Sequence, residues 1–507
     1  MTPVNANLAL RNVRAVLADR ILDDATVLVG PDGRIEAVTS GGATPSGAID
    51  GGGSFCLPGL IDTHSDGLEK ELRPRANVVL PVDFALRSFE GRLRSSGVTT
   101  VFHGVGFEDK PAYDRTIDQA HDFCTVIAER RRPGTAPTEH RVLHRVEARS
   151  PGGLAAALAR LPESEEPLAG SVAAAPLVSF EDHTPGQGQF RNIEKFRHSV
   201  AEERRPPGVD VDTFVQRAID DAETRSALRE EHIAGIGALA RSGRIRLLGH
   251  DLEDAVQVAE ANEVWRASVA EFPLSLGAAA EARDRAMPVV MGAPNVLRGG
   301  SHSGNIAAAD MVGRGLCDVL ASDYQPSTLL AAVFVLAAEG VTSLPAAVGL
   351  VTSGPATMAG LTDRGRLAPG CRADLVLVDL DGRWPRAGDV AGDRAGPGRR
   401  RGLTGGGAAA PVAVPAQAGS TVPPLDAATP PSPSPVGSIA ELYDIVQDRT
   451  IPTRGQPQRQ RSSHPAPGAA RSGHRRRGDN HHAPRPAGSG GRPPRHPPEP
   501  SGRIGPP

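Results

Sequence analysis

Cysteine is scarce in this sequence of 507 residues, and the few cysteines lie far apart. The four are Cys56, Cys124, Cys317 and Cys371, and no two of them form a CxxC pair. This spacing excludes a dense disulfide framework, so we expect reduced thiols in a reducing compartment.

Long hydrophobic runs are missing as well. The apolar stretch over residues 329 to 338 falls well short of the roughly 18 residues that cross a bilayer. The N-terminus mixes charged with apolar residues and lacks the apolar segment of a signal peptide. With 39% hydrophobic residues, the chain can still form one large core or two ordinary domains. We therefore expect a soluble, cytoplasmic protein without a membrane partner.

Aromatic residues make up only 3% of the chain, and proline and arginine gather near its end. Residues 401 to 507 hold 21 of the 46 prolines, and residues 449 to 507 carry a charge balance of +10. Because the whole chain carries −3, residues 1 to 448 carry −13. We expect residues 390 to 507 to be disordered, since they have little to bury. Aromatics are not interleaved with the arginines, which argues against nucleic acid as a partner.

The rest of the chain shows two patterns of strand-forming residues. Residues 8 to 55 contain short β-rich runs separated by PDG and GGAT, which predict a small antiparallel sheet. From residue 57 to about 338, helix-like stretches alternate with eight short apolar runs: LPGLID, VTTVF, RVLHRVE, APLVSF, RIRLLG, VAEFP, PVVMG and CDVLAS. Eightfold alternation of strand and helix favours a (β/α)8 barrel.

Two of the intervening stretches carry helix signals. Leu86, Phe89 and Leu93 share one face of a helix predicted over residues 84 to 94. Asp251 is a suitable N-cap for a helix predicted over residues 251 to 262.

Ligand-type side chains follow several predicted strands, at the end of a barrel where active sites lie. His64 and Asp66 are two residues apart, so both side chains point the same way on an extended chain. Glu147 and His250 close two other runs, and His183 and Asp323 shortly follow two more. This set favours two divalent ions with a bridging water, Zn²⁺ or Mn²⁺, and excludes a thiolate site. Taken singly, each histidine could be an ordinary loop residue, and Asp251 or Asp323 could cap a helix.

Two segments are suited to binding anions. RGGSHSGN follows the seventh predicted strand, where barrels often bind phosphate, and LEKELRPR follows the HxD pair directly. Without a binding role, RGGSHSGN could be a Gly-rich turn and LEKELRPR could be the charged start of a helix. Cationic donors beside a metal site indicate a phosphorylated substrate. The donors are Arg298, Ser301, His302 and Ser303 in the first segment, and Lys70, Arg73 and Arg75 in the second.

At these residues the sequence resembles the alpha-D-ribose 1-methylphosphonate 5-triphosphate diphosphatases of the carbon-phosphorus lyase pathway, within the amidohydrolase superfamily. The likeness runs in order from about residue 8 to 380. DHTPGQ and GAPNVLRGGSHSGN are its most specific motifs, whereas PGLID and APGCRADLVLVD are shared by amidohydrolases more widely. Other matching stretches are SSGVTTVFHGV, HRVEARS, LGHDLE, AEFPLSL and LASDYQPSTLLAA.

The resemblance implies hydrolysis of alpha-D-ribose 1-methylphosphonate 5-triphosphate to the 5-phosphate and pyrophosphate, in phosphonate catabolism. It implies that residues 1 to 55 begin a small β domain, residues 56 to 355 form the barrel, and residues 356 to 385 return to complete the β domain. The usual HxH of the superfamily is HxD here. The implied metal positions are His64, Asp66, Glu147, His183 and His250, with Asp323 as the metal-linked acid/base.

Two other functions fit parts of the pattern. A metal-dependent C–N hydrolase, such as a deacetylase or cyclic amidase, can use the same barrel and generic site but has little use for RGGSHSGN. A non-catalytic scaffold would bind nucleic acid through the basic tail and hold no metal. The family likeness stops near residue 382, and a natural extension or a shifted reading frame can each produce the tail. No feature of the sequence predicts the oligomeric state.

Overall fold

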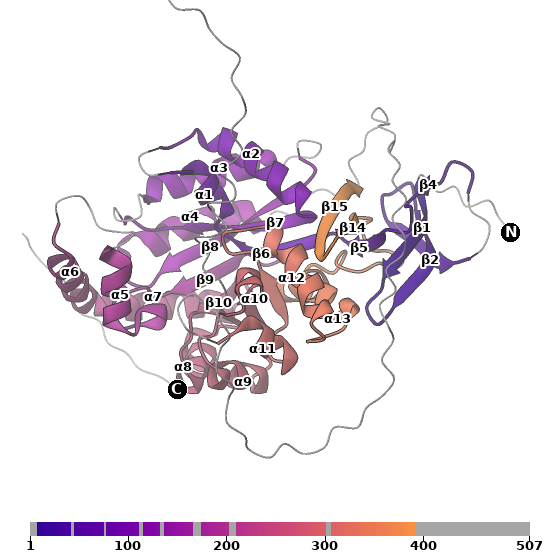
Figure 1. Ribbon diagram of the computed structural model, residues 1–507. Helices are drawn as coiled ribbons and strands as arrows, with labels where there is room; N and C mark the ends of the chain where they lie inside the picture. The colour runs from indigo at the N-terminus through magenta and orange to yellow at the C-terminus, as the bar shows by residue number, and fades with distance from the viewer. Residues whose placement is uncertain are drawn as a thin grey trace, which may run out of the picture. The chain divides into compact units, whose positions relative to one another are not determined.

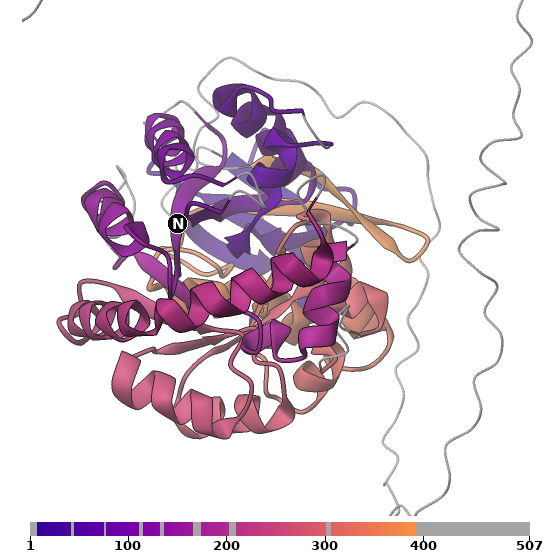
Figure 2. The same cartoon turned by 90° about the vertical axis from the view of Figure 1, so that its left-hand side faces the viewer.

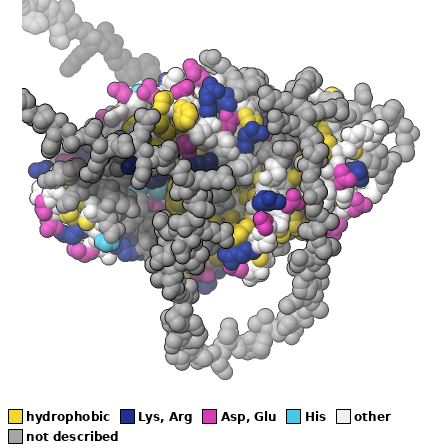
Figure 3. All heavy atoms as spheres, turned by 45° about the horizontal axis from the view of Figure 1, so that its top comes forward, with side chains coloured by type: hydrophobic (Ala, Val, Ile, Leu, Met, Phe, Trp, Pro, Cys, Tyr) yellow, Lys and Arg dark blue, Asp and Glu magenta, His cyan; other side chains and the backbone are white. Residues whose placement is uncertain are grey.

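The computed structural model describes residues 8–41, 45–75, 78–110, 115–131, 136–165, 174–201, 209–300 and 306–391. Residues 392 to 507, nearly all of the predicted tail, lie outside the described residues. No helix within the described ranges has both the length and the apolar character needed to span a bilayer. Acidic and basic side chains are interspersed over the described part of the face shown in Figure 3.

The eight predicted barrel strands all form, and each pairs in parallel with the next along the chain. They are β6 (Leu60–Ser65), β7 (Val98–Gly106), β8 (Glu139–Glu147), β9 (Leu177–Glu181), β10 (Arg246–His250), β11 (Val269–Glu271), β12 (Val289–Gly292) and β13 (Val319–Ala321). Figures 1 and 2 show the helices arranged around these strands. A bridge between Ser65 and Asp323 joins the last strand to the first and closes the barrel.

The helices between the strands follow the apolar patterns of the sequence. In α2 the stripe of Leu86, Phe89 and Leu93 is buried, as predicted. The helix expected from Asp251 instead begins at Ala255, because Asp254 is the residue whose side chain accepts from Gln257 N–H. The α-helices are α1 (Gly67–Leu72), α2 (Val82–Ser95), α3 (Ile117–Arg130), α4 (Gly153–Glu165), α5 (Ile193–Ser199), α6 (Val211–Thr224), α7 (Ser226–Arg241), α8 (Ala255–Glu260), α9 (Leu276–Asp284), α10 (Ala293–Arg298), α11 (Ala308–Gly313), α12 (Ser327–Ala338), α13 (Leu344–Gly349) and α14 (Ser353–Ala359).

A second sheet combines the N-terminal strands with the segment that follows the barrel. Its order is β15-β14-β5-β1-β2-β3, with β4 also paired to β1. The return strand β14 pairs antiparallel with β5, and β15 continues the sheet from β14. The strands are β1 (Leu8–Val16), β2 (Ile21–Val29), β3 (Ile35–Ser40), β4 (Ile49–Asp50), β5 (Phe55–Pro58), β14 (Leu375–Asp381) and β15 (Trp384–Ala391).

The interior of the barrel is apolar toward the amino ends of its strands. Ile61, Phe102, Leu143 and Leu248 pack there in one buried cluster, together with side chains of α14. This packing closes one end of the barrel, so a cavity can open only at the carboxyl ends of the strands.

A buried ionic network links the barrel to the returning segment. Glu139, at the start of β8, accepts from Arg364 Nη1 at 2.7 Å and from Arg372 Nη1 at 2.6 Å. Arg141 Nε donates to the other Glu139 oxygen at 2.7 Å. Burial by itself raises the pKa of Glu139, but the three guanidinium groups outweigh this effect and hold the pKa well below its usual range.

We predict that Glu139→Gln lowers the free energy of unfolding by about 3–5 kcal/mol, because it leaves buried guanidinium groups without their counter-charge. Urea unfolding followed by circular dichroism measures the change. The matched control is Glu263→Gln, since Glu263 is exposed and pairs with Arg285 at the surface. Its effect should stay below about 1 kcal/mol. Equal effects of the two substitutions would contradict the structural role of Glu139.

Candidate active site

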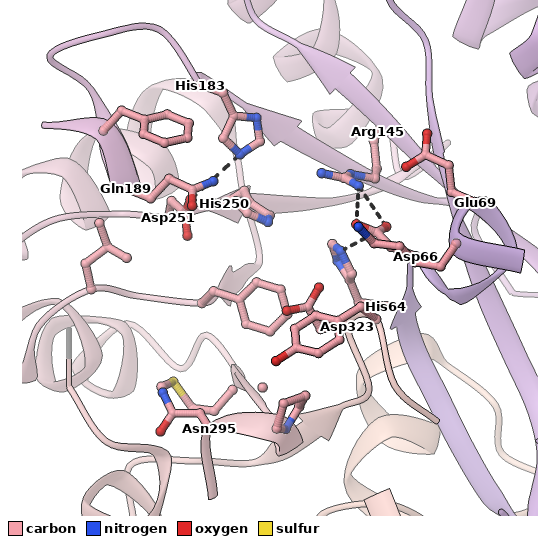
Figure 4. A pocket seen from close by; sticks show the side chains of 18 of the residues that line it. His64, Asp66, Glu69, Arg145, His183, Gln189, His250, Asp251, Asn295 and Asp323 are labelled. Atoms are coloured by element: carbon pink, nitrogen blue, oxygen red, sulfur yellow. Dashed lines mark hydrogen bonds and ion pairs between the residues drawn. The ribbon is translucent and has the colours of Figure 1, made fainter. Parts of the chain in front are cut away.

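The carboxyl ends of the barrel strands surround a cavity of about 620 Å³. In Figure 4, Asp66, Glu69 and Arg145 lie on one side of this cavity, and His183, Gln189, His250 and Asp251 lie on another. His64 and Asp323 lie between the two groups. The barrel fold thus gathers polar side chains from strand ends that are far apart in the sequence.

Asp323 lies at the seam where the barrel closes. Its N–H donates to His64 O at 3.0 Å, and its own carbonyl accepts from Asp66 N–H at 2.5 Å. The backbone at Asp323 is left-handed, with φ of 57°, so it is held in an unfavourable conformation by these neighbours. Burial, and then the negative charge of Asp66, raise the pKa of Asp323.

His64 is held from the sixth barrel strand. Its Nδ1 lies 2.8 Å from Glu271 Oε1, and Ser179 Oγ donates to Glu271 Oε2 at 2.6 Å. Burial lowers the pKa of His64, but the Glu271 carboxylate outweighs it and the net shift is upward. A histidine bonded in this way through Nδ1 keeps Nε2 for another partner.

A second histidine group lies at the carboxyl ends of β9 and β10. His183 Nδ1 lies 3.0 Å from Glu147 Oε2, while its Nε2 lies 3.8 Å from Asp251 Oδ2. His250 Nδ1 is 3.4 Å from the same Asp251 oxygen. Burial lowers the pKa of His250, but Asp251 and Glu181 outweigh it and raise the pKa to about 10.

Arg145 lies between two carboxylates at the cavity wall. Its Nη1 donates to both oxygens of Asp66, at 2.7 and 2.8 Å. Its Nε and Nη2 donate to the two oxygens of Glu181, at 2.7 and 3.0 Å. The guanidinium group therefore pairs with Glu181 in the bidentate geometry of two parallel bonds, and with Asp66 through one nitrogen shared between both carboxylate oxygens.

All six predicted metal ligands lie at this cavity or directly beside it. Four overlapping groups have ligand atoms within 4.8 Å of one another among the described residues. They are His64, Asp66 and Asp323; His183, His250 and Asp251; Glu147, Glu181 and His183; and His64, His250 and Glu271.

Sequence reasoning missed three acidic members of these groups: Glu181, Asp251 and Glu271. Each lies at or directly after a predicted strand, in SFED, LGHD and VAEFP. The search for ligand-type side chains at strand ends, which identified the other ligands, therefore applies to these three as well. Asp251 was interpreted as a helix cap, yet its φ of 54° and its contact with His250 place it in the site.

The predicted anion-binding residues divide into two sets. Lys70, Arg73 and Arg298 line the cavity, whereas Ser301, His302 and Ser303 lie outside the described residues. Arg75 is described but is not among the residues that line the cavity. The cavity also contains Lys110 and Arg115, which the sequence did not single out. Arg115 donates to both oxygens of Glu69 at 2.7 Å and to Glu108 at 2.9 Å.

The donor set suits a divalent metal ion. The four groups contain only imidazoles and carboxylates, the ligands preferred by Zn²⁺ and Mn²⁺. Two buried atoms of the cluster, His250 Nδ1 and Asp251 Oδ2, form an ion pair with each other at 3.4 Å but have no hydrogen bond to any other residue among those described. The pKa of about 10 for His250 reflects a surplus of negative charge, which a cation would neutralise.

Comparisons with known proteins identify the family of the chain. The chain is 36% identical over 373 residues to alpha-D-ribose 1-methylphosphonate 5-triphosphate diphosphatase from Escherichia coli (strain K12), which covers 73% of this chain and 95% of that protein. A family model described as "Amidohydrolase family" matches residues 303–389.

Solved structures show more distant similarity. A triazine hydrolase variant is 14% identical with a TM-score of 0.47, over 74% of this chain and 87% of that chain. A dihydropyrimidinase from Brevibacillus agri is 16% identical with a TM-score of 0.42, over 73% and 86% of the two chains. It is the extended match to the Escherichia coli protein that places this chain in the family of alpha-D-ribose 1-methylphosphonate 5-triphosphate diphosphatases, within the amidohydrolase superfamily.

Proposed function

We propose that the protein hydrolyses alpha-D-ribose 1-methylphosphonate 5-triphosphate to the corresponding 5-phosphate and pyrophosphate. The observation that carries this proposal is the match to the Escherichia coli diphosphatase over nearly its whole length. The cavity supports it, because lysine and arginine side chains line the same space as the imidazole and carboxylate cluster. An unphosphorylated amide would make little use of these cationic groups.

The imidazole and carboxylate cluster is the proposed binding site for divalent metal, Zn²⁺ or Mn²⁺. A divalent ion bound there would lower the pKa of water and withdraw negative charge from phosphoryl oxygens. His250 must be neutral to act as a ligand, so its proton leaves when metal binds. Glu147 fixes the ring of His183 through Nδ1, which directs Nε2 toward Asp251.

Asp323 is the proposed general base. Its carboxylate lies within 4.8 Å of the ligand atoms of His64 and Asp66, and its raised pKa brings it closer to neutral pH. It accepts a proton from water as the water oxygen bonds to the α-phosphorus. The bond from this phosphorus to the bridging oxygen breaks, and pyrophosphate leaves in line.

The cationic lining is proposed to bind the anionic ends of the substrate. Lys70 and Arg73 come from α1 and its C-terminal end, directly after the HxD pair. Arg298 ends α10, which follows the seventh barrel strand, β12. Charge-assisted hydrogen bonds from such groups hold phosphate and phosphonate oxygens during the displacement.

We predict that metal-loaded protein converts the ribose triphosphate phosphonate to pyrophosphate and the 5-phosphate, as followed by phosphorus NMR. In ¹⁸O-water the label should enter the 5-phosphate, because water attacks the α-phosphorus. Label in pyrophosphate would place the attack on the β-phosphorus. Orthophosphate as the first product, or no turnover, would contradict the proposal. Dihydrouracil and hydantoin serve as substrates for the alternative C–N hydrolase and should not be cleaved.

Asp323→Asn should lower kcat by about 100-fold or more, because an amide cannot accept the proton. KM should change much less, since the side chain is not proposed to bind the phosphates. Asp284→Asn, at an exposed position on α9, is the control and should retain full activity. A normal kcat for Asp323→Asn would remove Asp323 from the role of base.

Arg298→Ala should lower kcat/KM by about 10- to 100-fold, which corresponds to a lost charge-assisted hydrogen bond of about 1.5–3 kcal/mol. Arg314→Ala removes an exposed arginine near α11 and provides the comparison. If Arg298→Ala matched this control, the cationic lining near α10 would have no part in binding the substrate.

A further inference from the structure

We propose that the guanidinium group of Arg145 is a built-in cation that takes the place of a second metal ion. The site then holds one divalent ion per chain, bound by His183, His250 and Asp251. The inference rests on the proposed metal dependence but not on the identity of the substrate. It differs from the expectation of two ions that the sequence supports.

The first observation is that Arg145 uses the carboxylates that a second ion would need. Both oxygens of Asp66 and both oxygens of Glu181 accept from its guanidinium nitrogens, at 2.7 to 3.0 Å. Arg145 is only 7% exposed, so these ion pairs are shielded from water. An ion bound to Asp66 would lie within about 5 Å of the guanidinium group, where like charges repel strongly.

The second observation is that the neighbouring strand leaves room for this arrangement. A Cβ atom added at Gly104 of β7 would lie 2.5 Å from Asp66 Oδ1 and 3.0 Å from Arg145 Cδ. Both distances are shorter than normal contacts between nonbonded atoms. The Asp66–Arg145 pair therefore fits over β7 only because residue 104 has no side chain. The second barrel strand contributes space instead of a ligand.

The third observation is how the four ligand groups divide. Two of them, the group with Asp66 and the group with Glu181, contain a carboxylate already paired to Arg145. In a third group Glu271 has both oxygens bonded, to His64 and Ser179. Only the group of His183, His250 and Asp251 has neither of these features.

This remaining group has the geometry of a single metal site. Asp251 Oδ2 lies 3.4 Å from His250 Nδ1 and 3.8 Å from His183 Nε2. Ligand atoms about 2.1 Å from one tetrahedral ion are separated by about 3.4 Å. His250 Nδ1 and Asp251 Oδ2 are both buried, and neither has a hydrogen bond to any other residue among those described. Figure 4 shows this group apart from Arg145 and Asp66.

The test is to count ions in the full-length chain after chelation and reloading with Mn²⁺. Elemental analysis of the desalted protein should give one Mn²⁺ per chain. Its electron paramagnetic resonance spectrum should show the six-line pattern of isolated Mn²⁺, without the features of a coupled pair. Asp66→Asn should keep its single ion, whereas Asp251→Asn should lose it.

Arg145→Met tests the guanidinium group itself and should raise the count to two ions per chain, with a coupled spectrum. Arg149→Met is the matched control, because Arg149 pairs with Asp182 at 3.3 Å outside the four ligand groups. It should hold one ion. If Arg145→Met does not fold, the wild-type count and the Asp66→Asn count still decide the question.

Two ions in the wild type, loss of the ion in Asp66→Asn, or a single ion in folded Arg145→Met would each overturn the inference. The count is made without substrate, so it is separable from the proposed reaction. A protein with one ion and no diphosphatase activity would contradict the proposed function only. An active enzyme with two ions would contradict the inference only.

Discussion

The burial of many carboxylates at one mouth of the barrel is the constraint on which the rest of the site depends. Six acidic side chains belong to the four ligand groups, and ion-sized charges removed from water require nearby counter-charges. The protein provides some of these itself, through Arg145 and the histidines. The carboxylates of the four groups outnumber these internal cations, and Asp251 and Glu181 raise the pKa of His250. Affinity for a divalent cation follows from that surplus.

The residues that close the barrel also belong to the candidate active site. Across the seam between β13 and β6, Asp323 N–H donates to His64 O and Asp323 O accepts from Asp66 N–H, so the pairing that closes the barrel also places the proposed base beside the HxD pair. Just before the base, Ser322 is held by the buried Asp62, which accepts from its N–H at 3.0 Å. A slip of one residue at the seam would turn Asp323 away from the cavity. Fold stability and the position of the base are therefore coupled.

Much of the fold could be predicted, because strands and helices leave local patterns. All eight barrel strands and the buried stripe of α2 follow from apolar periodicity. Five of the six predicted ligands line one cavity and Glu147 lies beside it against His183, since parallel strands end at the same mouth. Local patterns say nothing about which donors pair with one another. Glu271 holds His64 across 207 positions of sequence, and Arg145 holds Asp66 across 79, so these partners emerge only from the closed barrel.

Counter-charge by arginine has consequences different from those of a metal ion. A guanidinium group cannot lose its charge near neutral pH and stays attached to the chain, so Asp66 and Glu181 remain paired whether or not metal is present. In the proposed one-ion site, the part of the cavity formed by Asp66, Glu181 and Arg145 is independent of metal supply, and only the group of His183, His250 and Asp251 requires an ion. Gly104 is the feature that makes this possible, because any side chain there would collide with the ion pair. The glycine at position 104 of β7, the second barrel strand, thus leaves the space in which Arg145 neutralises Asp66.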